Sequence, residues 1–169
     1  MSDVQGRRLL DAFIAGQRPS RWVTRERPKI DRIACPWVIR RFIDPNAIFF
    51  YVPTAEVFEV AKREGAVAFD IPGAPIEHEG NRCSFDTLLS RFRLDEPALL
   101  AVATIVRGAD TDRHELAPEA AGLHAISLGL SLTHHDDNAM LDQGMVLYDA
   151  LLAWAKSARG ERHAWKPAS

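Results

Sequence analysis

The sequence predicts a single domain of the α/β or α+β class, with a small sheet of about three strands in its front half and a helix-rich back half. Three observations lead to this prediction. The chain has 169 residues, which is the length of one domain. In the front half, short apolar runs bounded by glycine and proline alternate with segments of helical pattern. In the back half, apolar residues recur at helical spacing.

The front half contains the expected strands, which are placed at residues 29–34, 47–52, 66–71 and 76–79. A helix is expected to begin at Pro36, because a proline at the first helical position loses no hydrogen bond, and to run to Ile43. Another helix is expected from residue 54 to about Glu64, where Gly65 ends it. The segment 22–24 is extended in character but too short to assign.

Each helix expected in the back half has its own start signal. These signals are Ser84, Pro97, Pro118 and either Asp136 or Asp137. The first of these helices is expected to end near Phe92, and a further short amphipathic helix is expected at residues 7–15. We therefore expect an N-terminal arm at 1–21, a folded domain at 22–157 and a C-terminal tail at 158–169.

Composition excludes several classes of protein. The net charge is −2, so no positive field supports binding to nucleic acid. The apolar runs are far shorter than a membrane span, and the first residues lack the apolar core of a signal peptide. We therefore expect a cytoplasmic protein with no membrane partner, in which Cys35 and Cys83 are reduced thiols.

The two cysteines are candidates for thiol chemistry. Cys35 directly precedes Pro36, and a thiolate is favoured at a helix N-terminus, where Arg32 and Arg41 would add positive charge for an anion. Cys83 precedes the helix expected at Ser84 and is a candidate nucleophile or soft ligand. The alternative for Cys35 is a buried cysteine that acts as a small hydrophobic residue.

Carboxylates and one imidazole stand at the ends of expected elements. Asp70 ends a strand, His78 is a candidate ligand or base, and Asp110 and Glu119 lie at helix ends. Mixed carboxylate and imidazole ligands suit Zn, Mn or Fe. The alternatives are a hydrogen-bonded turn histidine and acids that cap helices. No glycine-rich phosphate loop or dinucleotide motif is present, so no organic cofactor is expected.

Several motifs resemble the ChrB-type chromate-resistance family over about residues 22–156. They are KIDRIACPWVIRRFIDP at 29–45, HEGNRCSF at 78–85, IVRGAD at 105–110, PEAAGL at 118–123 and YDAL at 148–151, in the same order as in the family. The candidate residues that lie in these motifs or between them are Asp31, Arg32, Arg41, Asp70, His78, Cys83, Asp110 and Glu119.

The resemblance implies a role in the response to chromate, which is a stress response. Longer ChrB proteins are regarded as chromate-responsive regulators, and this chain resembles their C-terminal domain, so nucleic acid is not an expected partner. Similar domains fused to rhodanese-like sulfurtransferase domains suggest such a protein as a partner. The last helix, with Tyr148 and Trp154, offers a face for a homodimer or for the core, and core packing is favoured.

Our principal hypothesis is a chromate-resistance-family domain that binds a metal ion or a small oxyanion. The expected metal ligands are His78, Asp110, Glu119, Asp31 and Asp70. Arg32 and Arg41 would hold the oxyanion, with Cys83 or Cys35 as a thiol near it. One alternative is a metal-dependent hydrolase that resembles the DHH-type phosphoesterases, although their paired-histidine signature is absent. The other is a chromate-sensing module without catalysis.

Overall fold

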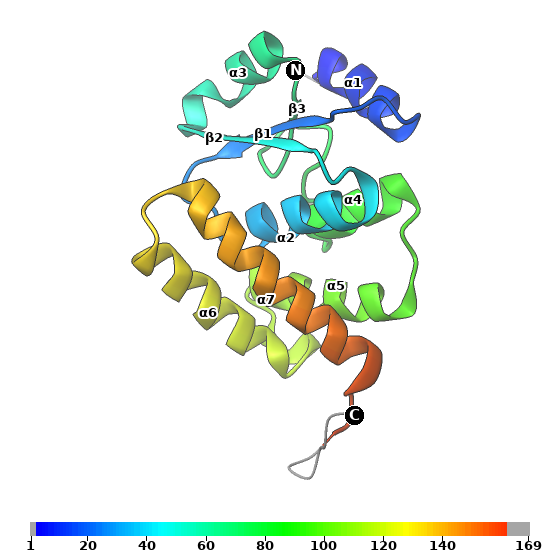
Figure 1. The fold of residues 1–169 in the computed structure, drawn as a ribbon, viewed down its shortest axis with the longest axis vertical. Coiled ribbons are helices and arrows are strands. Elements are labelled where there is room, and N and C mark those ends of the chain that lie inside the picture. Colours follow the sequence, from blue (N-terminus) through cyan, green and yellow to red (C-terminus); the bar gives the residue numbers. More distant parts are fainter. Residues whose placement is uncertain (1–2, 162–169) are drawn as a thin grey trace.

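The computed structural model describes residues 3–161. Its elements in chain order are α1 (Val4–Ile14), β1 (Arg21–Arg25), α2 (Asp31–Val38), the π-helical turn η1 (Ile39–Ile43), β2 (Ile48–Val52), the 3₁₀ turn η2 (Thr54–Glu56), α3 (Val57–Glu64), β3 (Val67–Ala68), α4 (Ser84–Phe92), α5 (Pro97–Asp110), the 3₁₀ turn η3 (His114–Leu116), α6 (Glu119–Thr133) and α7 (Asp137–Ser157). Figure 1 shows α3 above the sheet and α2 with α4 below it, with α5, α6 and α7 further down. The predicted fold class is confirmed.

The sheet has three parallel strands in the order β2-β1-β3. Its central strand β1 contains the segment 22–24 that sequence reasoning left unassigned, and Trp22 pairs with both Phe49 and Val67. A single bridge between Phe69 and Ile76 extends the sheet beyond β3. The strand expected at 66–71 is therefore much shorter than predicted, and that at 76–79 is reduced to isolated bridges.

The strand predicted at 29–34 is wrong, because helix α2 begins at Asp31. Nearly every residue of α2 is buried, and a short run that is apolar on all sides has no period that separates a strand from a helix. One buried side of the helix lies against α7, where Ile33 faces Gly144 so closely that a Cβ there would be 2.2 Å from Cγ2 of the isoleucine. This helix therefore packs against a helix more than a hundred residues away, a contact that no local sequence pattern contains.

Pro36 was expected to begin a helix and instead lies inside α2. In an α-helix the N–H of residue 36 would donate to the carbonyl oxygen of Arg32, but proline has no N–H. The hydroxyl of Tyr51 in β2 donates to this carbonyl at 3.1 Å instead. A contact between a helix and the sheet therefore replaces the hydrogen bond that the proline removes.

The helices of the back half lie where their start signals placed them. Two details of the capping differ from expectation or refine it. Cys83, not Ser84, is the N-cap of α4, and Asp136 caps α7 by accepting a hydrogen bond from the backbone N–H of Ala139 at 2.7 Å. Gly65 ends α3 with a positive φ of 60°, as expected of a C-terminal glycine.

Two groups of buried side chains hold these layers together. Adjacent residues of a strand face opposite sides of the sheet. Val23 accordingly lies in a small cluster with Val57 and Val60 of α3, whereas Trp22 joins the main core. The Trp22 ring is 5.7 Å from that of Phe13 in α1, so a helix within the expected N-terminal arm contributes to the main core.

Two further expectations concern the helices and the C-terminal end. None of the helices described in residues 3–161 combines the length and the apolar composition needed to cross a bilayer. Tyr148 of α7 is buried and stacks on Trp37, with ring centroids 5.5 Å apart, which is the core packing favoured for this helix. Most of the tail expected at 158–169 lies outside the described residues.

Candidate metal and anion site

The candidate site lies at the edge of the sheet where the parallel strands end. Arg25 is the last residue of β1, and Asp70 follows β3 by two residues. The chain after β1 returns to the same edge with Asp31, the first residue of α2. Ligands of open parallel sheets bind in the crevice outside the carboxyl ends of the strands. The topology therefore gathers three charged side chains at the place where such folds bind ligands.

Asp31 joins the N-termini of two helices. Its Oδ2 accepts hydrogen bonds from the backbone N–H of Ser84 at 2.6 Å and of Phe85 at 3.4 Å. A residue of α2 therefore binds the free N–H groups at the start of α4, next to the N-cap residue Cys83. Ile30 before it has a φ of 34°, a value rarely adopted by a β-branched residue, and the Tyr148 hydroxyl donates to its carbonyl oxygen at 3.3 Å. Asp31 is fully buried, and its Oδ1 has no hydrogen-bond partner among residues 3–161.

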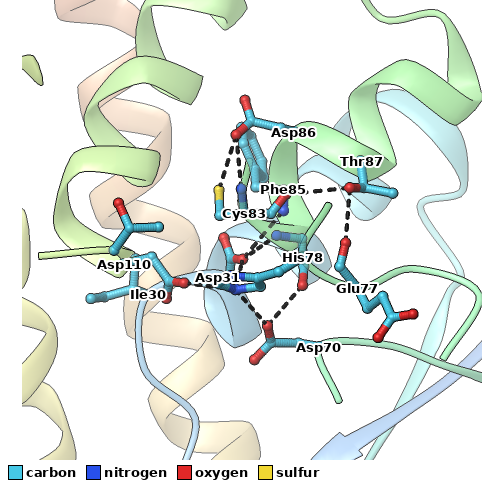
Figure 2. Close-up of polar contacts among 12 residues, drawn as sticks. Ile30, Asp31, Asp70, Glu77, His78, Cys83, Phe85, Asp86, Thr87 and Asp110 are labelled. Carbon is cyan, nitrogen blue, oxygen red and sulfur yellow. Dashed lines mark hydrogen bonds and ion pairs between the residues drawn. The ribbon is translucent and has the colours of Figure 1, made fainter. Parts of the chain in front are cut away.

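His78 lies among three carboxylates. Its Nε2 is 3.0 Å from Oδ2 of Asp110, 3.5 Å from Oδ2 of Asp31 and 3.5 Å from Oδ1 of Asp70. Figure 2 shows the imidazole between these side chains, which come from α2, α5 and the segments that follow β3. Hydrogen bonds to Asp31 and Asp70 raise the pKa of His78 to about 10. Since its side chain is 44% exposed, the imidazole is reachable from solvent.

Asp70 is held by positive charge and by hydrogen bonds. Its Oδ1 accepts from the Ser84 hydroxyl at 2.8 Å, and its Oδ2 is 3.1 Å from Nη2 of Arg25 and 3.4 Å from Nε of Arg32. Burial alone would raise the pKa of Asp70, but hydrogen bonds from His78 and Ser84 and the two guanidinium groups hold it below its usual range. This carboxylate is thus firmly ionised.

The other two carboxylates have the opposite tendency. Burial, opposed by the hydrogen bond to His78, raises the pKa of Asp31 to about 7. Burial and the negative charge of Asp70 also raise the pKa of Asp110. A positive charge in this position stabilises both anions, because buried carboxylates without a cation are costly.

A cavity of about 330 Å³ opens beside these residues. Two kinds of charged side chain line it. The basic ones are Arg25, Lys29 and Arg32, and the acidic or imidazole ones include Asp70, His78 and Asp110. A ligand in this cavity would therefore meet both cation-binding and anion-binding groups, with Arg25 and Arg32 next to Asp70.

The structure brings together most of the residues predicted as metal or oxyanion ligands. Those that meet at this cavity or directly behind it are Asp31, Arg32, Asp70, His78 and Asp110. Glu119, at the start of α6, belongs neither to the described carboxylate–imidazole group nor to the cavity lining. Arg41 lies in η1 and makes a two-pronged ion pair with Asp149 of α7, at 2.9 and 2.7 Å, which fastens η1 to α7.

Neither of the two candidate cysteines is exposed to solvent. Both are buried free thiols. The expectation that Cys35 stands at a helix N-terminus is wrong, because α2 begins at Asp31 and places the thiol inside the helix. Cys83 caps α4, and its thiol donates to Asp86 at 3.4 Å. Burial raises the pKa of both thiols well above its ordinary value, so neither has the environment of a reactive thiolate.

Sequence reasoning missed several groups around the cavity. Arg25 and Lys29 were not selected, since the short strand β1 had not been assigned and nothing marked its carboxyl end. Ser84 was expected only as a helix cap, whereas its hydroxyl holds Asp70 and its backbone N–H binds Asp31. A strand assigned to 21–25 would have drawn attention to Arg25 by its position alone.

The fold and the site define a small mixed α/β domain with a carboxylate–imidazole cluster at the carboxyl edge of a parallel sheet. Residues 22–155 match the family described as ChrB, C-terminal domain, and the chain belongs to this family, as its motifs predicted. It is 36% identical over 139 residues to a protein from Cupriavidus metallidurans named Protein ChrB. That match spans 82% of this chain but only 41% of the relative. No solved structure matches the chain.

Proposed function

We propose that this domain binds a divalent metal ion through Asp31, His78 and Asp110, holds a small oxyanion at the adjacent basic groups, and serves in the response to chromate. The metal part of the proposal is primary. The oxyanion part follows from the basic residues that line the same cavity. The role in chromate response is supported by membership of the ChrB family, and the two binding activities give that role a physical basis.

The convergence of three ligand atoms carries the proposal of a metal site. One atom each from Asp31, His78 and Asp110 lies within 4.8 Å of the other two. Ligands about 2.0–2.2 Å from an ion are separated by about 3.0–3.5 Å in octahedral or tetrahedral geometry. The separations of 3.0 and 3.5 Å from Nε2 of His78 to the two carboxylates agree with this spacing.

The electrostatics of the cluster also favour a cation. Oδ2 of Asp31, which lies 3.5 Å from Nε2 of His78, already accepts from the N–H of Ser84. Oδ1 is buried without a partner among the described residues, so an ion bound by both oxygens would satisfy it. A divalent ion would take the place of the proton on His78 and would compensate Asp31 and Asp110 more fully than that proton does. The mixed oxygen and nitrogen donors suit Zn, Mn or Fe.

The basic residues that line the cavity favour the binding of an oxyanion. Arg25 and Arg32 reach the cavity from the end of β1 and the start of α2, with Lys29 between them in sequence. Nε of Arg25 is buried with no hydrogen-bond partner in the described part of the chain, and Lys29 is exposed. Guanidinium and ammonium groups are suitable partners for a tetrahedral dianion such as chromate or sulfate.

The metal proposal is tested by equilibrium dialysis of the purified protein against Zn²⁺ and Mn²⁺. We expect His78→Ala to lower the affinity of one bound equivalent by at least about tenfold, since even groups that only support metal ligands contribute that much. His135→Ala is the matched control, because His135 is exposed and lines a different cavity. Equal binding by the wild type and His78→Ala would refute the metal proposal.

The oxyanion proposal needs a separate measurement. Sulfate and molybdate are tetrahedral dianions that oxidise thiols far less readily than chromate does, so they report binding alone. We expect Lys29→Ala to weaken their binding in calorimetric titrations, whereas Lys62→Ala, an exposed lysine on α3, leaves it unchanged. Identical binding curves for the two variants would refute the proposal that the basic residues of the cavity bind the oxyanion.

A further inference from the structure

We propose that Asp112, His114 and His124 form a second transition-metal site beside the same cavity, separate from the site of His78. This inference does not depend on the proposed function. The three residues lie after α5, in η3 and in α6, and neither the family motifs nor the sequence pattern selected them.

The two imidazoles already have the spacing of ligands to one ion. Nε2 of His114 is 3.3 Å from Nδ1 of His124, and the rings are nearly perpendicular at 86°. Two nitrogens about 2.0–2.1 Å from a tetrahedral zinc ion are about 3.3–3.4 Å apart. Oδ1 of Asp112 is 3.7 Å from Nε2 of His114, and all three ligand atoms lie within 4.8 Å of one another.

The backbone fixes the loop that carries Asp112 and His114. The N–H of Arg113 donates to the carbonyl oxygen of Gly108 at 2.9 Å, and its guanidinium donates to the carbonyl oxygen of Asn81 at 2.6 Å. At Gly108, α5 approaches α6 so closely that a Cβ there would be 2.9 Å from that of Ala120. The relative position of the ligands on the loop and on α6 is therefore set by close packing.

The donor set indicates the class of metal. Two imidazoles and one carboxylate bind Zn²⁺, Co²⁺ or Ni²⁺ in preference to Mg²⁺ or Ca²⁺, which take oxygen ligands. Three protein ligands leave a position for water or for a ligand atom. The Asp112 side chain is 89% exposed, so it can move toward the two imidazoles at little cost.

The location connects this second site to the cavity. Asp112 and His124 line the cavity together with Asp110 and His78 of the first site. An ion at the second site would therefore border the space in which the basic residues are placed to hold an anion. The two sites remain distinct because they share no ligand.

X-ray absorption at the zinc edge tests the second site, because the two sites differ in their number of imidazole ligands. In His78→Ala loaded with Zn²⁺, the remaining ion should show two imidazoles. In His124→Ala it should show one, and the bound stoichiometry should fall by one equivalent relative to the wild type. Asp112→Asn alters only an exposed side chain and should weaken the second equivalent without any change in folding.

Controls and adverse outcomes separate the two proposals. His135→Ala should keep both equivalents. Full retention of metal in both His124→Ala and Asp112→Asn would overturn the second site and leave the first intact. Zinc bound with two imidazoles in His78→Ala, together with no loss of any equivalent in that variant, would support the second site while refuting the first.

Discussion

The carboxylate of Asp31, at the start of α2, accepts the backbone N–H of Ser84, at the start of α4, at 2.6 Å. Fifty-three residues separate the two in sequence. The same serine donates its hydroxyl to Asp70 at 2.8 Å. One short segment therefore fixes two of the carboxylates that surround His78, so the candidate site and the junction of the two helices are one structure.

This junction predicts a loss of stability that is independent of any metal. Asp31→Ala leaves the N–H of Ser84 buried without its acceptor, which costs about 1–3 kcal/mol in the free energy of unfolding. Asp31→Asn keeps an acceptor oxygen and should lose less. Urea denaturation of both variants in the presence of a chelator measures the difference, and equal losses would contradict the capping role.

The ion pair between Asp86 and Arg107 predicts a pH dependence of stability. The guanidinium donates to the carboxylate at 2.7 and 2.6 Å. Burial alone would raise the pKa of Asp86, but the hydrogen bonds and charge of Arg107 more than offset it and hold this pKa below its usual range. A depressed folded pKa contributes stability above the unfolded pKa of about 3.9, and this contribution is lost as the pH falls through the folded value.

Asp86→Asn tests this dependence directly. At pH 7 we expect the variant to be about 1.5–3 kcal/mol less stable than the wild type, the range for hydrogen bonds to charged groups. The difference should begin to narrow as the pH falls below about 3.9, where the carboxylate of the unfolded wild type takes up a proton, and should vanish only below the lower pKa of the folded protein. Denaturation curves between pH 3 and pH 7 provide the measurement, and a difference independent of pH would count against the assignment.

Gly144 and Gly129 form a matched pair for the packing of α2 on α7. A Cβ at Gly144 would meet Ile33 at 2.2 Å, so Gly144→Ala should cost about 1–3 kcal/mol from overpacking. A Cβ at Gly129 in α6 meets nothing within 4 Å, and Gly129→Ala should gain up to about 1 kcal/mol from helix propensity. Thermal unfolding of the two variants should move in opposite directions; a common direction would show the packing at Ile33 to be misassigned.

The buried thiols predict slow labelling of the folded protein. Cys35 and Cys83 have no exposed surface, and burial raises the pKa of each. Iodoacetamide at neutral pH should modify neither thiol in buffer and both in denaturant, as followed by mass spectrometry. Rapid labelling of one thiol in the native protein would restore the hypothesis that it is a catalytic or sensing cysteine.

The sequence predicted the features that depend on neighbouring residues and missed those that depend on distant contacts. Helix starts marked by Pro97 and Asp136 were predicted well, because capping chemistry is local. The segment 29–34 was misassigned, because a short buried run has no period that separates a strand from a helix, and its packing against α7 is not visible in a local pattern. Composition and position selected His78 and Asp70, but no local signal tells that Glu119 lies apart from them or that His114 meets His124.

Anomalous diffraction from crystals of the protein grown with Zn²⁺ tests the central claim most directly. If the cluster is a metal site, a peak at the zinc edge is expected within bonding distance of Nε2 of His78 and of carboxylate oxygens of Asp31 and Asp110. A second peak at His114 and His124 would support only the second metal site. Zinc bound at full occupancy at other positions, with no peak at His78 and with the three carboxylates still paired to its imidazole, would contradict the claim that this cluster is a metal site.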